Sequence, residues 1–393
     1  MALVDIVGAV HKLLKLHNNV EIDGAVFKLH YRVTSTILIS FCLLVTCTGL
    51  LGKPIHCAHG DSPYLQDDVV NTFCWIHSTF TLPRYFHGNK QLPYPGVGPG
   101  MEGDEVVYHA YYQWVPFMLF LQGLFFYVPH WLWKTWEGGK MNSIAAGLSA
   151  PIMSPEDRKT RITHLKSYIC MSLHSHNMYA SKFFICEILN FINVLGQMYF
   201  LNKFLGGLFL TYGMDVINFT EQNQSQRSDP MIVVFPRVTK CSFEMFGPSG
   251  SIVTHDLMCI LALNVINEKI YVFLWFWFVI LTTLTCIAFL YRILVFCVPI
   301  IRSGLLQKRG QLRHKVTLEA LIPRLQFGDY FLLYLISKNV EGLTFHSLLE
   351  ALAHEINESR KPDPSDPETY PLRKLDSSRK SPKEKFTMLS ERI

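Results

Sequence analysis

The sequence predicts an all-α membrane protein with four transmembrane helices, disulfide-linked extracellular loops that hold short strands, and a helical cytoplasmic region. First, only 17% of the 393 residues are charged, while 49% are hydrophobic and 13% aromatic. An average soluble chain has about 25% charged residues. Second, four long apolar stretches occur along the chain. Third, four cysteines lie between these stretches rather than within them.

Three of the apolar stretches contain no charged residue. They cover residues 33–52, 110–133 and 270–291, which are 20, 24 and 22 residues long. Because the hydrocarbon core of a bilayer is about 30 Å thick, a spanning helix needs about 20 apolar residues. A buried core helix of a soluble protein is the alternative, but such a helix rarely needs this length.

A fourth stretch, from Phe183 to Tyr212, is apolar but interrupted by polar side chains. A buried core helix is a more serious alternative here. Polar groups are costly in lipid, so we expect them to face protein or a cavity. Glu187, near the cytoplasmic end, is expected to extend its carboxylate to the membrane interface. The polar residues are Glu187, Asn190, Asn193, Gln197 and Lys203.

Charge counting predicts the orientation of the four spans. Segments 1–32, 134–182 and 298–393 carry 27 Lys and Arg, whereas segments 52–107 and 211–268 carry six. When the long tail is limited to basic residues near the last span, the ratio is still 16 to six. Since cytoplasmic loops are enriched in Lys and Arg, both termini are predicted to be cytoplasmic. The first 32 residues lack the long apolar core of a cleavable signal peptide.

These features divide the chain into ten predicted segments. Residues 1–17 have apolar positions at helical spacing, which predicts an amphipathic helix that lies on the inner leaflet or folds into a pore mouth. The tail is rich in Pro, Ser and charge, which is typical of disorder. The segments are 1–32 (N-terminal helix and lead-in), 33–52 (first span), 53–109 (first extracellular loop), 110–133 (second span), 134–182 (cytoplasmic loop), 183–210 (third span), 211–268 (second extracellular loop), 269–292 (fourth span), 293–360 (cytoplasmic helices) and 361–393 (disordered tail).

Four of the ten cysteines fall in the predicted extracellular loops: Cys57 and Cys74 in the first, Cys241 and Cys259 in the second. An even number of cysteines in an oxidising compartment indicates disulfides. Four cysteines allow three pairings, and their positions in the sequence do not choose among them. Four unpaired buried thiols are the alternative. The spacing does not match a zinc site, so no metal is expected.

Short local motifs predict a strand, a turn, a helix kink and two glycosylation sites. The sequence IVVF at 232–235 predicts a short strand, and Gly247-Pro248-Ser249-Gly250 predicts a turn. Pro116 is predicted to kink the second span from inside. Glycosylation sequons at Asn218 and Asn223 follow the third span closely, so they are expected low on the flank of the second loop.

Several function classes are disfavoured. GLLGKP at 49–54 has the wrong spacing for a phosphate-binding loop, and HEINE at 354–358 lacks the second zinc histidine. We therefore expect no catalytic residues and no cofactor. The spans carry too few charges and too little internal symmetry for a transporter. No basic stripe with interleaved aromatics indicates nucleic-acid binding.

The segment YYQWVPF at 111–117 resembles the signature of innexins, the invertebrate gap-junction proteins. Five further sequence blocks are similar to innexin blocks and appear in the family's order, so that the resemblance covers about residues 1–340. The chain looks most like an insect innexin. The similar blocks are FCWI at 73–76, FYVPHWLWKTWEGG at 126–139, FPRVTKC at 235–241, FGPSGS at 246–251 and LNVINEKIYVFLWFWF at 263–278.

This resemblance implies a multi-pass plasma-membrane protein of the gap junction. Innexin subunits have two cysteines in each extracellular loop, and by analogy Cys57 pairs with Cys259 and Cys74 with Cys241. They assemble among membrane lipids into a ring, an octamer in the family's architecture, as homomers or with other innexins. The ring docks with a ring of the apposed cell. The N-terminal helix folds into the pore, which places Ala2, Leu3, Asp5 and Ile6 at the pore wall.

The implied function is a gap-junction channel with a wide pore for ions and small metabolites. The first alternative is a non-junctional hemichannel that releases small molecules, as in the related pannexins. The second is a four-span adhesion or scaffold protein, which would show no conductance. Recordings from paired cells that express this chain alone separate the three.

Overall fold

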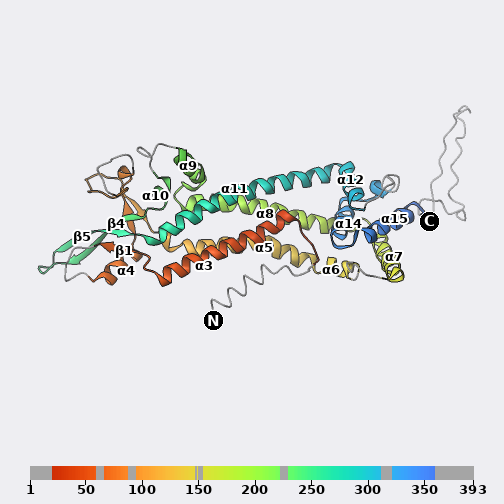
Figure 1. Ribbon diagram of the computed structural model, residues 1–393, viewed down its shortest axis with the longest axis horizontal. Helices are drawn as coiled ribbons and strands as arrows, with labels where there is room; N and C mark the ends of the chain where they lie inside the picture. The colour runs from red at the N-terminus through yellow and green to blue at the C-terminus, as the bar shows by residue number, and fades with distance from the viewer. Residues whose placement is uncertain are drawn as a thin grey trace, which may run out of the picture.

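The computed structural model describes residues 20–58, 66–86, 94–146, 148, 154–221, 229–310 and 321–358. The long helices run along the longest axis of the molecule, with a sheet layer at one end and a second helical layer at the other (Figure 1). The predicted N-terminal helix with Ala2, Leu3, Asp5 and Ile6, the sequon at Asn223 and the tail from 361 lie outside the described residues.

Within the described residues, four helices are long and apolar enough to cross a membrane, as predicted. The first covers Ala25–Leu51, the second is α5 (Val115–Glu137), the third is α8 (Asn177–Phe204) and the fourth is α11 (Ala262–Cys297). The 36 residues of α11 are about 54 Å long at 1.5 Å per residue, so this helix extends well beyond a 30 Å hydrocarbon core. The first helix contains α2 (Ala25–Lys28), a π-helical segment η1 (Leu29–Thr34) and α3 (Ser35–Leu51).

The third helix ends before the apolar stretch does. Gly206 and Gly207 adopt φ angles of +68° and +91°, which L-residues with side chains rarely adopt. The Gly207 N–H donates to the Asn202 carbonyl at 2.6 Å and closes the helix end. The chain then turns into a separate helix, α9 (Phe209–Glu221).

Pro116 lies within the second span, as predicted, but the prediction that it kinks the span from inside is wrong. Pro116 occupies the first turn of α5, where the missing N–H would have no partner within the helix. The 3₁₀ turn η3 (Tyr111–Gln113) leads into this helix start. The proline inside α5 is Pro129, thirteen residues further along the chain.

Asn190 and Gln197 of the third helix face protein, as expected, whereas Lys203 is exposed. Glu187 has a charged partner within the bundle. Its carboxylate accepts two hydrogen bonds, of 2.8 and 3.0 Å, from the guanidinium of Arg292 on α11. Glu187 therefore has a charged partner on α11, while its extension to the membrane interface stays a prediction. The partner on α11 compensates the charge within the bundle. Asn190 is also buried.

The sheet layer contains five antiparallel strands in the order β1-β5-β4-β2-β3. The predicted turn connects β4 to β5: Gly250 donates to the Gly247 carbonyl at 2.9 Å and has a φ of +80°. The helix α4 (Asp67–His77) and the 3₁₀ turn η2 (Pro83–Tyr85) belong to the same layer. The strands are β1 (His56–Ala58), β2 (Thr79–Thr81), β3 (Val107–His109), β4 (Val238–Phe246) and β5 (Ile252–Ile260).

The predicted strand at 232–235 is wrong, because this segment forms the short helix α10 (Pro230–Val234). The Asp229 carboxylate accepts a hydrogen bond from the Met231 N–H at 2.9 Å and caps the helix. Pro230, at the first helical position, has its φ already set for a helix. Cap and proline together outweigh the β propensity of the following Ile and Val residues.

The second helical layer packs against the ends of α5 and α8. The ring of Phe183 lies 4.9 Å from Trp133 of α5 and 4.9 Å from Phe331.

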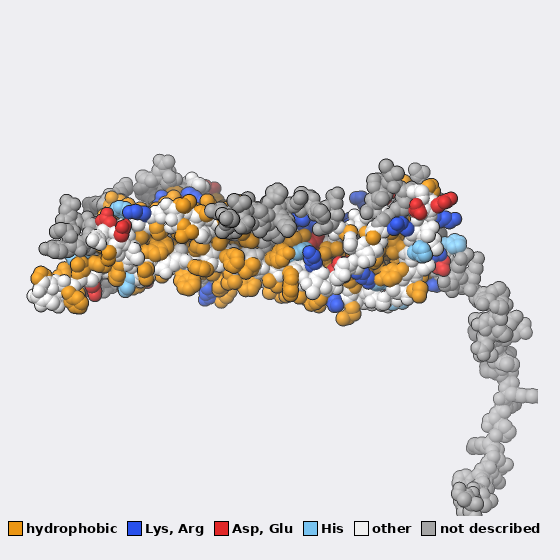
Figure 2. All heavy atoms as spheres, turned by 90° about the horizontal axis from the view of Figure 1, so that it is seen from below, with side chains coloured by type: hydrophobic (Ala, Val, Ile, Leu, Met, Phe, Trp, Pro, Cys, Tyr) orange, Lys and Arg blue, Asp and Glu red, His pale blue; other side chains and the backbone are white. Residues whose placement is uncertain are grey.

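Hydrophobic side chains gather along the middle of the visible face of the molecule (Figure 2), where the four long helices run. The second helical layer lies beyond one end of these helices. The layer contains α6 (Lys140–Ala145), α7 (Pro155–Met171), α12 (Pro299–Gly310), η4 (Ile322–Arg324), α14 (Phe327–Asn339) and α15 (Gly342–Glu358).

Candidate functional site

Two disulfides link the segment before α5 to the segment before α11. Cys57 of β1 lies directly opposite Cys259 of β5 in the strand register, and their sulfur atoms are 2.02 Å apart. Cys74 of α4 lies 1.99 Å, sulfur to sulfur, from Cys241 of β4. All four cysteines are buried. The bonds close loops of 202 and 167 residues, so each constrains distant parts of the chain.

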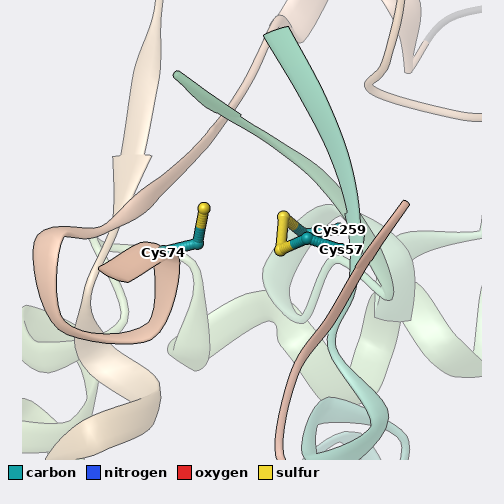
Figure 3. A group of neighbouring side chains, drawn as sticks. All are labelled: Cys57, Cys74 and Cys259. Carbon is teal, nitrogen blue, oxygen red and sulfur yellow. A yellow bond between two sulfur atoms is a disulfide. The ribbon is translucent and has the colours of Figure 1, made fainter. Parts of the chain in front are cut away.

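The sulfur atoms of Cys57, Cys74 and Cys259 lie within 4.8 Å of one another (Figure 3). A cluster of three cysteines could resemble a metal site, but zinc and similar ions bind thiolates. Each of these sulfur atoms is bonded to another sulfur, in the pairs Cys57–Cys259 and Cys74–Cys241. The cluster is therefore two neighbouring disulfides.

An ion pair joins the sheet layer to α11. The side chain of Glu268, in the second turn of α11, is 1% exposed and accepts hydrogen bonds from Arg237 at 2.8 and 3.0 Å. Lys269 lies 3.1 Å from the same carboxylate. The hydroxyl of Tyr212 on α9 donates to the backbone carbonyl of Glu268 at 3.2 Å. Arg237 lies in the block FPRVTKC and Glu268 in the block LNVINEKIYVFLWFWF. No local pattern in the sequence predicts that these two residues form a pair.

A second contact brings three of those blocks together. The buried Asn264 side chain donates to the Tyr111 hydroxyl at 2.9 Å and to the Pro236 carbonyl at 2.8 Å. Burial raises the pKa of Tyr111 well above its usual value, so the phenol stays neutral. Gln113, from the same block as Tyr111, donates to the Trp75 carbonyl at 2.5 Å. The YYQWVPF block thus connects the first loop, the second loop and two long helices.

His109 lies at the end of β3, next to this cluster. Its Nε2 is 2.8 Å from the hydroxyl of Thr81 on the neighbouring strand, and the residue is 7% exposed. Burial lowers the pKa of His109 from 6.5 to about 4. The imidazole is therefore neutral at physiological pH.

The β4–β5 hairpin ends in an exposed apolar tip, formed by Phe246, Ile252 and Val253, which we call the hairpin tip. Phe246 is 80% exposed, Ile252 64% and Val253 40%. The hairpin projects beyond the rest of the layer, away from the long helices (Figure 1). Exposed large apolar side chains at such a point are typical of a contact surface for another protein.

The helix α4 adds a second apolar surface to the layer. Val69 and Ile76 are 53% and 68% exposed, and they border a shallow hollow of about 590 Å³. Asp68, Thr72, Phe73 and His77 line the same hollow. Cys74 on the opposite face of α4 holds the helix to β4.

One predicted glycosylation site is described by the structure. Asn218 is exposed on α9, which lies beside the ends of the long helices and not at the hairpin tip (Figure 1). The structure brings the four cysteines together in two disulfides, places Pro116 at a helix start, and places Asn218 on α9.

Comparison with known proteins agrees with this architecture. A family model described as Innexin matches residues 23–356. The chain is 47% identical to innexin inx2 of Schistocerca americana, over 90% of this chain and 98% of that protein. It is 47% identical to innexin inx2 of Drosophila melanogaster over 90% and 96%, and 42% identical to innexin inx3 of the same species over 98% of each. Coverage of nearly the whole chain, together with four membrane-length helices, confirms the resemblance read from the sequence: the chain belongs to the innexin family, whose members are gap-junction channel subunits.

Proposed function

We propose that eight copies of this chain form a ring around a wide, water-filled pore, and that two rings on apposed cells dock through their sheet layers. Both termini face the cytoplasm in this arrangement, and the sheet layer is extracellular. Ions and small metabolites then pass between cells down their gradients. The observation that carries the proposal is the sheet layer itself, a disulfide-linked unit that presents the exposed apolar hairpin tip at the end of the molecule.

The long helices support assembly into a ring. Only 22–39% of the most apolar part of each helix is buried within one copy of the chain. Lipid covers part of the remaining apolar surface, and neighbouring copies cover the rest. Other innexins can take the place of a neighbouring copy, because the contacts between subunits need only be similar along the ring.

The N-terminal residues supply the selectivity of the proposed pore. One Asp5 per subunit would become a ring of negative charge, multiplied by the number of subunits, beside Ala2, Leu3 and Ile6. Asp5→Lys should therefore shift reversal potentials toward anion permeability and lower the conductance. Unchanged selectivity and conductance would instead favour a helix that lies on the inner leaflet.

The hairpin tip provides the test of docking. Phe246→Asp places a charge on the surface that docking would bury, and an unpaired buried charge is strongly unfavourable. We expect junctional current between paired cells to be lost, with single-cell currents and surface abundance unchanged. Ile217→Asp on α9, where Ile217 is 37% exposed, is the matched control and should preserve coupling. Junctional current that survives Phe246→Asp would contradict docking through the tip.

The same recordings test the alternative of a release hemichannel. Strong single-cell currents from the wild-type chain with no coupling between paired cells would favour that function. A lack of current in both configurations would favour an adhesion or scaffold protein.

A further inference from the structure

The segment just before the first long helix is held by the end of α14. The backbone N–H of Glu21 donates to the side-chain oxygen of Asn339 at 2.5 Å. The side-chain nitrogen of Asn339 donates back to the carbonyl of Glu21 at 2.8 Å. One carboxamide therefore satisfies both backbone groups of one residue, as a neighbouring strand would. Glu21 and Asn339 are 318 residues apart in the chain.

The next two residues are also held through their backbones. Lys338, the neighbour of Asn339, donates to the carbonyl of Asp23 at 3.1 Å. The indole of Trp133 on α5 donates to the carbonyl of Ile22 at 3.1 Å. We call the contacts of residues 21–23 with Lys338, Asn339 and Trp133 the clamp.

Charges reinforce the clamp. The ammonium of Lys28 lies 2.8 Å from the Glu21 carboxylate, and that of Lys338 lies 3.7 Å away. The hydrogen bond from Lys28 lowers the pKa of Glu21, so this carboxylate stays ionised at physiological pH. Asp23 is 3% exposed, with Lys28 at 3.9 Å and His130 at 3.6 Å from its carboxylate.

The helix that carries Lys338 and Asn339 packs into a hydrophobic core. Phe331, Leu335 and Ile336 of α14 are at most 1% exposed, within the core that α14 shares with the ends of α5 and α8. Val20 and Ile22 pack against the same core. A displacement of α14 would therefore pull on Glu21 through two short hydrogen bonds, and Glu21 lies four residues after the predicted N-terminal helix (1–17) and 15 residues after Ile6.

We propose that Asn339 and Lys338 are positioning residues for the N-terminal pore segment, so that the C-terminal cytoplasmic helices set where residues 2–6 stand in the pore. This inference depends on the proposed function, because it assumes that the N-terminal segment lines the pore. The clamp itself consists of described residues and can be measured independently.

The first measurement is amide hydrogen exchange of the peptide that contains Glu21, on the purified full-length channel. Asn339→Leu removes both hydrogen bonds to Glu21 and should accelerate exchange of its N–H about tenfold, the scale expected for two hydrogen bonds. Asn339→Asp keeps the acceptor for the Glu21 N–H but loses the donor to its carbonyl, so a smaller acceleration is expected. Asn142→Leu, at an exposed position of α6, is the matched control and should exchange like the wild type.

The second measurement is single-channel recording of the same variants. Asn339→Leu should change the unitary conductance and the charge selectivity, whereas Asn142→Leu should change neither. If the clamp positions Asp5, the effects of Asn339→Leu and Asp5→Lys on selectivity should be non-additive in the double variant. A residue that only stabilises the fold would lower abundance without changing selectivity. Should Asn339→Leu fail to reach the membrane, Asn339→Asp and Lys338→Met provide the same comparison.

The outcomes separate this inference from the proposed function. Unchanged exchange at Glu21 in Asn339→Leu would overturn the clamp. Accelerated exchange with wild-type conductance and selectivity, in a channel whose selectivity Asp5→Lys does shift, would overturn the positioning role and leave the proposed function intact. Wild-type cells without any current would overturn the proposed function and, with it, the positioning role, whatever the exchange shows.

Discussion

The guanidinium of Arg237 holds the carboxylate of Glu268 by two hydrogen bonds, of 2.8 and 3.0 Å. Arg237 immediately precedes β4, and Glu268 lies within α11. The pair therefore connects the disulfide-linked sheet layer to the fourth long helix. Its two members differ in burial: the Arg237 side chain is 37% exposed and that of Glu268 is 1% exposed.

This difference in burial predicts unequal effects of removing either partner. Arg237→Met removes both guanidinium hydrogen bonds from the buried Glu268 carboxylate and leaves Lys269 at 3.1 Å, and hydrogen bonds to a charged group contribute about 1.5–3 kcal/mol. Glu268→Gln leaves Arg237 with access to solvent and to Asp229, 3.7 Å away, so a smaller loss is expected. Thermal unfolding of the solubilised protein gives the comparison. An equal or reversed order of the two melting temperatures would contradict this account.

The disulfides are expected to be essential for coupling. Cys74→Ser removes the bond to Cys241, which closes a loop of 167 residues, and should cost about 2–5 kcal/mol of stability. We expect junctional current to be abolished, because the hairpin that carries the tip is attached to α4 through this bond. Cys297→Ser, at an exposed free cysteine, is the control and should leave coupling intact.

Peptide mapping without reduction tests the pairing directly. Fragments joined as Cys57–Cys259 and Cys74–Cys241 are expected. The finding of four free thiols at these positions would disprove the bonds, and any other pairing would disprove this connectivity.

The sheet layer should lose stability at acidic pH through His109. Its pKa is about 4 in the folded protein and 6.5 in an exposed histidine, so the unfolded chain binds the proton more readily. The stability contributed by neutral His109 is complete above pH 6.5 and falls as the pH decreases from 6.5 toward 4. The maximal effect is about 3 kcal/mol, from 1.36 kcal/mol per pKa unit.

Melting temperatures of the wild type and of His109→Gln between pH 7.5 and 4 measure this contribution. The variant should melt lower at pH 7.5, because it disturbs the contact with Thr81, and its melting temperature should depend less on pH. His56→Gln, at an exposed position of β1, should follow the wild-type curve. Parallel curves for the wild type and His109→Gln would show that His109 does not contribute to the pH dependence.

Glycosylation at Asn218 is expected to leave docking free. Asn218 is exposed on α9, whereas the hairpin tip lies further from the long helices (Figure 1). A glycan there would extend from the flank rather than from the end of the sheet layer. Enzymatic deglycosylation should shift the apparent mass if the site is used, and Asn218→Gln should couple paired cells like the wild type. Coupling that appears only after Asn218→Gln would favour the hemichannel.

The strand prediction at 232–235 and the kink prediction at Pro116 were wrong for related reasons. In both cases the residue preferences were read correctly, but the position of a helix start decided the structure. The Asp229 cap turned a β-prone run into α10, and the 3₁₀ turn at Tyr111–Gln113 placed Pro116 in the first turn of α5. Helix starts depend on side-chain caps and preceding turns, and the periodicity of apolar residues carries no information about either.

The sequence by itself determined the four long helices and the turn at Gly247–Gly250, because both depend on neighbouring residues. A helix in lipid satisfies its own backbone hydrogen bonds, so about 20 apolar residues are a sufficient signal. The tertiary structure alone decided which residues meet across the chain: Cys57 with Cys259, Arg237 with Glu268, and Glu21 with Asn339. These contacts join residues between 31 and 318 positions apart, and their formation depends on how packed elements bring side chains together, which no local pattern encodes.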